Sequence, residues 1–237
     1  MSTRSIVQSR ANRCFVGAVA ALLCVVVTTR AANAGVIVGP DPAQTWSGFM
    51  NVSELPSNGG AFVFGSGWGT ADLTATFSGN VLTLGPNSVN DTSDFWYQGG
   101  GAPGHPGNKT MDANMYVENN AGTLSGQDVT FTGTVLSNTL ISPYTSVAFI
   151  KDFAPDFSSF NTVTAPLTPG DFSITLATNP APGRHVQYGF ETIGPDVWVT
   201  DRGPVGNVQI TSVPEPTALA LIALAGAAPL LRRRRVL

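Results

Sequence analysis

A run of three aromatic residues, followed by a loop rich in glycine and proline, is the stretch best suited to binding chemistry. It lies between Asp94 and Lys109 and reads Phe95-Trp96-Tyr97 at its start. Flat aromatic side chains suit the apolar faces of sugar rings, and surface loops often carry function. We therefore predict a sugar-binding platform at Trp96 and Tyr97. Asn108, Lys109 and Asp112 would bond to sugar hydroxyl groups. The alternative is that the aromatic residues end a buried strand.

The sequence indicates no catalytic residue. It contains neither G-x-S-x-G nor H-E-x-x-H, and no glycine-rich phosphate loop follows a strand-like segment. His105 and His185 are the only histidines, and each stands alone. A glycosidase needs only two suitably spaced carboxylates, however, and the chain is rich in acids. An envelope glycosidase or polysaccharide lyase of jelly-roll type therefore stays open as an alternative to a non-catalytic protein.

No cofactor is predicted, and calcium is the one metal left open. Asp152 and Asp156 stand close together and could supply the oxygen ligands that calcium prefers. Acids at such positions also cap turns, and the spacing is not that of an EF-hand. Cys14 and Cys24 both precede Gly35, so the chain after Gly35 contains no disulfide, thiol nucleophile or cysteine-ligated metal.

The charge of the central part of the chain excludes one class of partner. Residues 35–212 contain four basic and fourteen acidic residues, which gives a net charge of −10. Such a field repels the phosphate backbone of DNA or RNA. Nucleic acid is therefore not a predicted partner.

Short runs with alternating apolar and polar residues recur throughout residues 35–212. Each run is bounded by Gly, Pro, Asn or Asp, and no segment keeps a helical period. The clearest strand predictions are 73–77, 81–84, 129–135, 147–150, 172–176, 186–190, 197–199 and 208–210. We predict an all-β fold with a single β-sandwich of jelly-roll type. The order of strand-like runs and turns in residues 115–150 resembles that of carbohydrate-binding modules of this type.

The N-terminal residues 1–34 have the three parts of a secretory signal peptide. A basic region up to Arg13 precedes the apolar run 15–27, and Ala32-Asn33-Ala34 follows. The small residues Ala32 and Ala34 suit a signal peptidase, so we expect cleavage before Gly35. The apolar run is shorter than the roughly 20 residues of a membrane-spanning helix.

The C-terminal residues predict a short transmembrane helix. Residues 218–231 are apolar or small throughout, and a helix of this length spans about 21 Å against a hydrocarbon core of about 30 Å. A cluster of four arginines follows and should stay in the cytoplasm, where it stops transfer. These residues are Arg232, Arg233, Arg234 and Arg235. The helix is expected to hold the exported chain transiently in the inner membrane.

The motif ahead of this helix carries the clearest family resemblance. Val213-Pro214-Glu215-Pro216, the apolar helix and the arginine cluster together resemble the PEP-CTERM sorting signal of Gram-negative bacteria. The resemblance implies that an exosortase, a membrane-embedded cysteine protease, cuts near the Pro-Glu-Pro triplet. The predicted regions are thus a signal peptide (1–34), an extracellular β-sandwich (35–212) and a sorting signal (213–237). We expect a non-catalytic protein of the cell surface or extracellular matrix, with extracellular polysaccharide as the candidate ligand.

Overall fold

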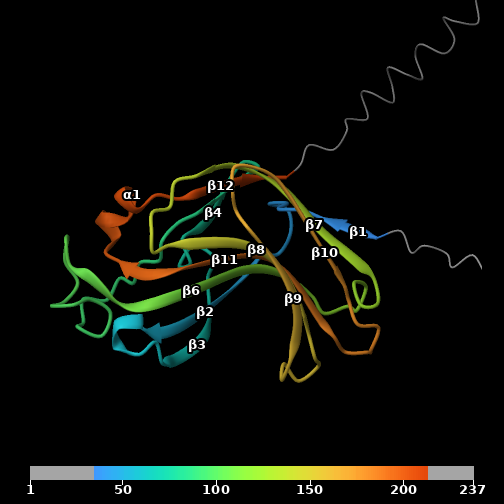
Figure 1. Ribbon diagram of the computed structural model, residues 1–237, viewed down its shortest axis with the longest axis horizontal. Helices are drawn as coiled ribbons and strands as arrows, with labels where there is room; N and C mark the ends of the chain where they lie inside the picture. The colour runs from blue at the N-terminus through green and yellow to red at the C-terminus, as the bar shows by residue number, and fades with distance from the viewer. Residues whose placement is uncertain (1–34, 213–237) are drawn as a thin grey trace, which may run out of the picture. The chain divides into compact units, whose positions relative to one another are not determined.

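Figure 1 shows a computed structural model of the chain, which describes residues 35–212. These residues form twelve strands and three short helical turns. The strands are β1 (Val36–Val38), β2 (Ser47–Glu54), β3 (Phe62–Trp68), β4 (Ala75–Ser78), β5 (Val81–Leu84), β6 (Pro106–Asn119), β7 (Asp128–Asn138), β8 (Thr145–Phe153), β9 (Phe160–Pro166), β10 (Gly170–Ala177), β11 (His185–Val197) and β12 (Val208–Thr211). The turns are η1 (Pro56–Asn58), η2 (Val199–Asp201) and α1 (Arg202–Val205). No helix within 35–212 is long and apolar enough to cross a bilayer.

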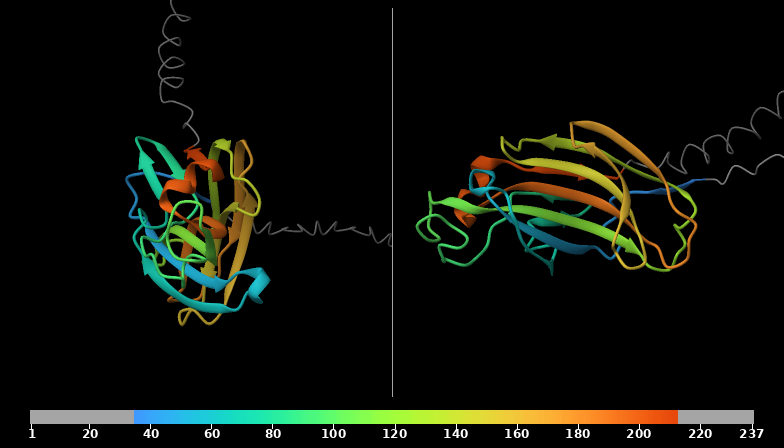
Figure 2. Two further views of the ribbon diagram at one scale, coloured as in Figure 1. Left: turned by 90° about the vertical axis from the view of Figure 1, so that its left-hand side faces the viewer. Right: turned by 60° about the horizontal axis from the view of Figure 1, so that its bottom comes forward.

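The strands build two six-stranded sheets, here called sheet A and sheet B. In sheet A, β7 pairs with β10 along one edge and with β1 and β12 along the other, and β5 and β4 continue from β12. Only the β1–β7 pair is parallel. Sheet B is antiparallel throughout, in the order β3-β2-β6-β11-β8-β9. Both sheets curve along their length (Figure 2).

The core lies between the two sheets, where alternate residues of central strands such as β6 and β7 are buried. Phe131 and Phe172 project from sheet A, and their rings meet Tyr188 and Phe190 of sheet B. The centroid of the Phe131 ring lies 5.2 Å from that of Phe190. Burial of large aromatic side chains contributes most to such a core. The predicted all-β sandwich is confirmed.

The connections between the strands agree with a β-sandwich of jelly-roll type. From β5 to β12 the chain changes sheet at each step except the β8–β9 hairpin. This is the alternation that a jelly-roll arrangement requires. Together the two sheets enclose the core of the described residues 35–212.

Three strand predictions differ from the structure. Residues 73–77 were predicted as a strand, but β4 begins only at Ala75. Residues 186–190 belong to one thirteen-residue strand, β11, which continues to Val197 through Pro195. Residues 197–199 were predicted as a separate strand, but β11 ends at Val197 and η2 begins at Val199. Trp198 instead packs against the core from this turn, where its ring meets Tyr97 edge to face.

Candidate functional site

Trp96 and Tyr97 are buried, so the exposed aromatic platform predicted at these residues is wrong. Trp96 retains 8% of its accessible surface and Tyr97 retains 0%. The Trp96 ring packs edge-on against Phe64 and Trp68. The Tyr97 hydroxyl donates to the backbone carbonyl of Val89 at 2.7 Å. Because both rings lie in the core, neither has a free face for a sugar.

Asn108 and Lys109 are also committed to contacts within the protein. The Lys109 ammonium lies 3.2 Å from Oε2 of Glu54 and 4.4 Å from the centroid of the Phe95 ring, and the residue is only 4% exposed. The side-chain amide of Asn108 donates to the carbonyl of Asp94 at 2.8 Å. The side chain of Lys109 joins β6 to β2 and that of Asn108 holds the segment before the aromatic run, which corrects their predicted role in binding.

The two acids considered for calcium make contacts within the protein. Both carboxylate oxygens of Asp152 are occupied, one by Nε of Arg184 at 2.8 Å and the other by the backbone N–H of Asn179 at 2.7 Å. Asp156 instead accepts from the hydroxyl and backbone N–H of Ser158 and caps a turn. Residues 35–212 contain no group of three or more His, Cys, Asp or Glu side chains placed to hold a metal ion.

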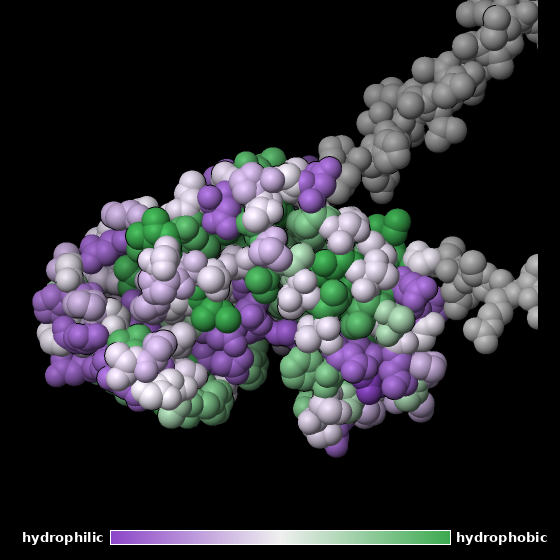
Figure 3. All heavy atoms as spheres, in the orientation of Figure 1, coloured by the Kyte–Doolittle hydropathy of each residue, from purple (hydrophilic) through white to green (hydrophobic). Residues whose placement is uncertain are grey.

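A groove of about 780 Å³ lies on the outer face of sheet B, opposite the core. Figure 3 shows it as a hollow with a polar floor beside the β8–β9 hairpin. Strands β2, β6, β8, β9 and β11 all contribute to it. The lining residues are Phe49, Asn51, Asp112, Asn114, Tyr116, Glu118, Lys151, Phe153, Phe157, Phe160, Thr162, Thr164, Gln187 and Glu191. Asp112 is the one residue of the sequence-based binding hypothesis that lies here.

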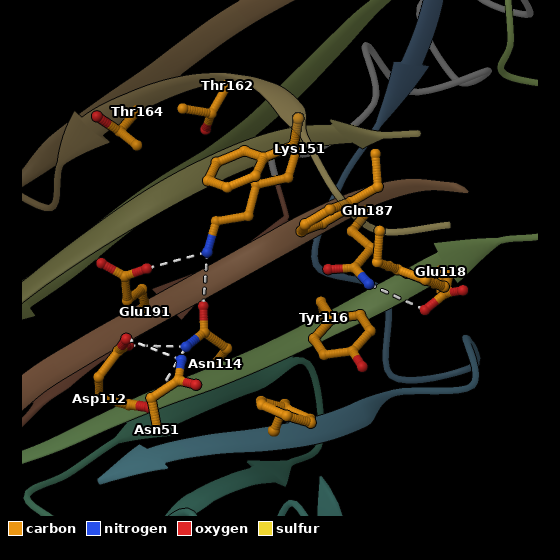
Figure 4. A pocket seen from close by; sticks show the side chains of 14 residues that line it. Asn51, Asp112, Asn114, Tyr116, Glu118, Lys151, Thr162, Thr164, Gln187 and Glu191 are labelled. Carbon is orange, nitrogen blue, oxygen red and sulfur yellow. Dashed lines mark hydrogen bonds and ion pairs between the residues drawn. The ribbon is translucent and has the colours of Figure 1, made fainter. Parts of the chain in front are cut away.

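The floor of the groove is a hydrogen-bonded network with side chains from β2, β6, β8 and β11 (Figure 4). The side-chain amides of Asn51 and Asn114 donate to Asp112, at 3.1 Å and 2.7 Å. The Lys151 ammonium donates to Oδ1 of Asn114 at 2.7 Å and to Oε2 of Glu191 at 3.0 Å. Each of these side chains is therefore held in one orientation by its neighbours.

Burial in this network raises the pKa of Asp112 above its usual value. Desolvation is the main cause, and the nearby carboxylate of Glu191 adds to it. The amides of Asn51 and Asn114 and the charge of Lys151 act in the opposite direction. The groove thus contains a carboxyl group that ionises less readily than an exposed aspartate.

A second polar cluster lies beside the first. The side-chain amide of Gln187 donates to Oε2 of Glu118 at 2.9 Å, and Nδ1 of His185 lies 3.2 Å from the other oxygen of Glu118. The ring of Phe157 stacks on the His185 imidazole, with centroids 4.2 Å apart and planes at 23°. This stack joins the polar floor to the aromatic wall of the groove.

The aromatic wall comes from the β8–β9 hairpin. Phe153 ends β8, Phe160 begins β9, and both contact Phe157 or each other, with centroids 4.9–5.5 Å apart. Phe157 is 51% exposed and has a φ of 57°, in the left-handed region that bulky residues rarely adopt. Such a backbone is commonly found at functional sites. The hairpin therefore presents an apolar ring to solvent at a cost in backbone energy.

The two-residue period of β6 explains how the floor is built. Met111, Ala113 and Met115 face the core, whereas Asp112 and Asn114 point to the opposite face. The alternation of Met-Asp-Ala-Asn-Met was a usable signal in the sequence, and the sequence analysis missed it. The pairing of β6 with β2 and β11, which brings Asn51 and Glu191 to the same place, has no signature in a single sequence.

Comparison with known proteins places one part of the chain. Residues 212–235 match the model of the PEP-CTERM protein-sorting motif. The chain carries a PEP-CTERM sorting signal. This confirms the resemblance seen in the sequence and supports export, membrane-associated sorting and processing by an exosortase. No curated protein and no solved structure matches the chain.

Most residues of the predicted signal peptide and sorting signal lie outside the part of the chain that the structure describes. These are the signal peptide 1–34 with Ala32 and Ala34, the motif Val213 to Pro216, the transmembrane helix 218–231 and the cluster Arg232 to Arg235. Gly35, the predicted first residue after cleavage, is described and lies exposed directly before β1. The predictions for the other residues stay predictions.

Proposed function

We propose that this PEP-CTERM protein is a non-catalytic component of the cell surface or extracellular matrix, and that it binds extracellular polysaccharide in the groove of sheet B. The observation that carries the proposal is the lining of the groove. A fixed polar floor lies next to exposed aromatic rings, on one face of a rigid sheet. The binding needs no cofactor.

The chemistry of a sugar matches this lining. A pyranose has an apolar face of C–H groups and a rim of hydroxyl groups, and carboxylates and amides bond well to hydroxyls. Phe157 and Tyr116 present the apolar surfaces, while Asp112, Asn114 and Glu191 present the polar ones. Because the network already fixes the polar side chains, little conformational entropy is lost when a ligand binds to them.

A second candidate, glycoside hydrolysis, is favoured by one observation. Asp112 and Glu191 lie in the same groove, and the pKa of Asp112 is raised while Glu191 is paired with Lys151. Glycosidases use two carboxyl groups whose environments differ in this way. Both groups are already bonded to neighbours in the floor, so we place binding ahead of catalysis.

Substitution of Phe157 or Tyr116, two of the aromatic residues that line the groove, should weaken glycan binding. Phe157→Ala and Tyr116→Ala each remove a ring whose burial against a ligand is worth about 1.5–3 kcal/mol. We expect the Kd of residues 35–212 for a glycan identified on an array to rise about tenfold or more in each variant. Isothermal titration calorimetry would measure the change.

Phe62→Ala is the matched control for this experiment. Phe62 is a 65% exposed phenylalanine on the edge strand β3 and does not line the groove. Its substitution should leave the Kd unchanged. Equal affinity in all variants would remove the site assignment, and absence of binding to every glycan would refute the proposed function. Release of new reducing ends would establish the enzymatic alternative.

A further inference from the structure

The groove carries an excess of negative charge. Asp112, Glu118 and Glu191 line it, against a single lysine, Lys151. That lysine is already paired with Glu191 at 3.0 Å. His185 lies at the margin, where Nδ1 is 3.2 Å from Glu118. A ligand entering the groove therefore meets carboxylates without a free cation among the described lining residues.

The hydrogen-bond donors of the floor are partly used within the protein. Lys151 donates to Asn114 and Glu191, and the amides of Asn51 and Gln187 donate to Asp112 and Glu118. Ionised carboxylates only accept hydrogen bonds. The carboxylates of Asp112, Glu118 and Glu191 therefore favour ligands that bring donors such as hydroxyl, amide N–H or ammonium groups.

The rest of the domain does not offset this charge. Residues 35–212 contain four basic side chains and fourteen acidic ones. Lys109 and Arg184 are held by Glu54 and Asp152, as Lys151 is by Glu191. A net charge of −10 on one small domain produces a field that repels anions.

We propose that the groove selects glycans without negative charge, meaning neutral sugars or amino sugars, and excludes polysaccharides that carry uronate, sulfate or phosphate groups. This inference rests on the proposed polysaccharide binding and adds the substrate class. Anionic glycans would place carboxylate or sulfate groups against Asp112, Glu118 and Glu191, where the described lining residues offer no cation besides Lys151, which is paired with Glu191.

Four hexasaccharides test the inference: those of glucose, N-acetylglucosamine, glucosamine and galacturonic acid. We expect residues 35–212 to bind at least one of the first three, and to bind the galacturonic acid oligomer at least about tenfold more weakly than the best of them. Repulsion between charges is screened by salt. The difference should therefore shrink between about 0.05 M and about 0.5 M sodium chloride, where the Debye length falls from more than 10 Å to less than 5 Å.

Glu118→Gln isolates the contribution of charge, because it keeps the shape of the side chain. In wild type, the galacturonic acid oligomer should have a higher Kd than the best of the other three oligomers. Glu118→Gln should reduce the ratio of these two Kd values about fourfold, as expected when one charge is removed at about 5 Å in water. Asp128→Asn is the control, since Asp128 is an exposed acid on β7 of the other sheet; it should leave the ratio unchanged.

The outcomes distinguish a failure of charge selection from a failure of polysaccharide binding. If the galacturonic acid oligomer binds as tightly as the others, or more tightly, the charge selection is wrong while polysaccharide binding stands. An unchanged ratio in Glu118→Gln likewise overturns it. If none of the four oligomers and no glycan on an array binds, both the inference and the proposed function fail.

Discussion

Asp152→Ala is expected to lower the free energy of unfolding of residues 35–212 by about 3–5 kcal/mol. Asp152 is fully buried, and its side chain pairs with Arg184, whose side chain is 10% exposed. Arg184 also donates from its guanidinium to the backbone carbonyl of Asp152 at 2.6 Å. Removal of the carboxylate leaves a buried cation without its counter-charge and the N–H of Asn179 without its acceptor. Both losses lower the free energy of unfolding.

Urea unfolding followed by tryptophan fluorescence measures this effect. Asp128→Ala is the control, because Asp128 is exposed and belongs to no ion pair among the described residues. It should leave the unfolding midpoint nearly unchanged. A loss below about 1 kcal/mol in Asp152→Ala, the range of exposed ion pairs, would show that the pair is not buried as described.

Asp196→Asn should raise stability at neutral pH and flatten its pH dependence. Asp196 is 1% exposed, and burial raises its pKa to about 6 from 3.8, against the opposing backbone hydrogen bonds from Lys109 and Asn108. One carboxylate oxygen accepts from the N–H of Lys109 at 3.1 Å, while the other has no partner. The folded protein therefore holds the proton more tightly than the unfolded chain does.

The sign of the pH effect follows from this difference. The stabilisation due to protonated Asp196 is complete below pH 3.8 and is lost as the pH rises through about 6. The loss amounts to about 3 kcal/mol at neutral pH. Urea unfolding of wild type and Asp196→Asn between about pH 4 and about pH 7.5 should show the two curves converging at the acid end. A constant separation, or a less stable variant at neutral pH, would contradict the assignment.

The β-sandwich could be predicted because several strands show an alternation of apolar and polar residues that is visible in the local sequence. In β7, Val129, Phe131 and Val135 alternate with threonine, and this pattern places the three apolar side chains in the core. The pattern does not say which strands become neighbours. Asn51, Asp112 and Glu191 come from three strands that only the pairing of sheet B brings together. The meeting of these side chains in one groove therefore could not be predicted from the sequence.

The aromatic run was misplaced for a different reason. The glycine-rich loop after Tyr97 indicated exposure, but Tyr97 forms a bridge with Gly107, and the N–H of Gly104 in the loop donates to the carboxylate of Asp201 at 2.6 Å. A Cβ at Gly107 would collide with the backbone of Asp196, so glycine permits this close approach. The exposed ring that completes the groove, Phe157, lies in a hairpin where the sequence analysis weighed only the neighbouring acids for calcium.

A chemical-shift titration of residues 35–212 with a bound neutral or amino oligosaccharide tests the central claim most directly. The account predicts that the side-chain amide signals of Asn51, Asn114 and Gln187 shift together with backbone signals on the outer face of sheet B. Signals of core residues in sheet A, such as Phe131, should stay in place. Shifts confined to the glycine-rich loop after Tyr97 or to the outer face of sheet A would contradict the account.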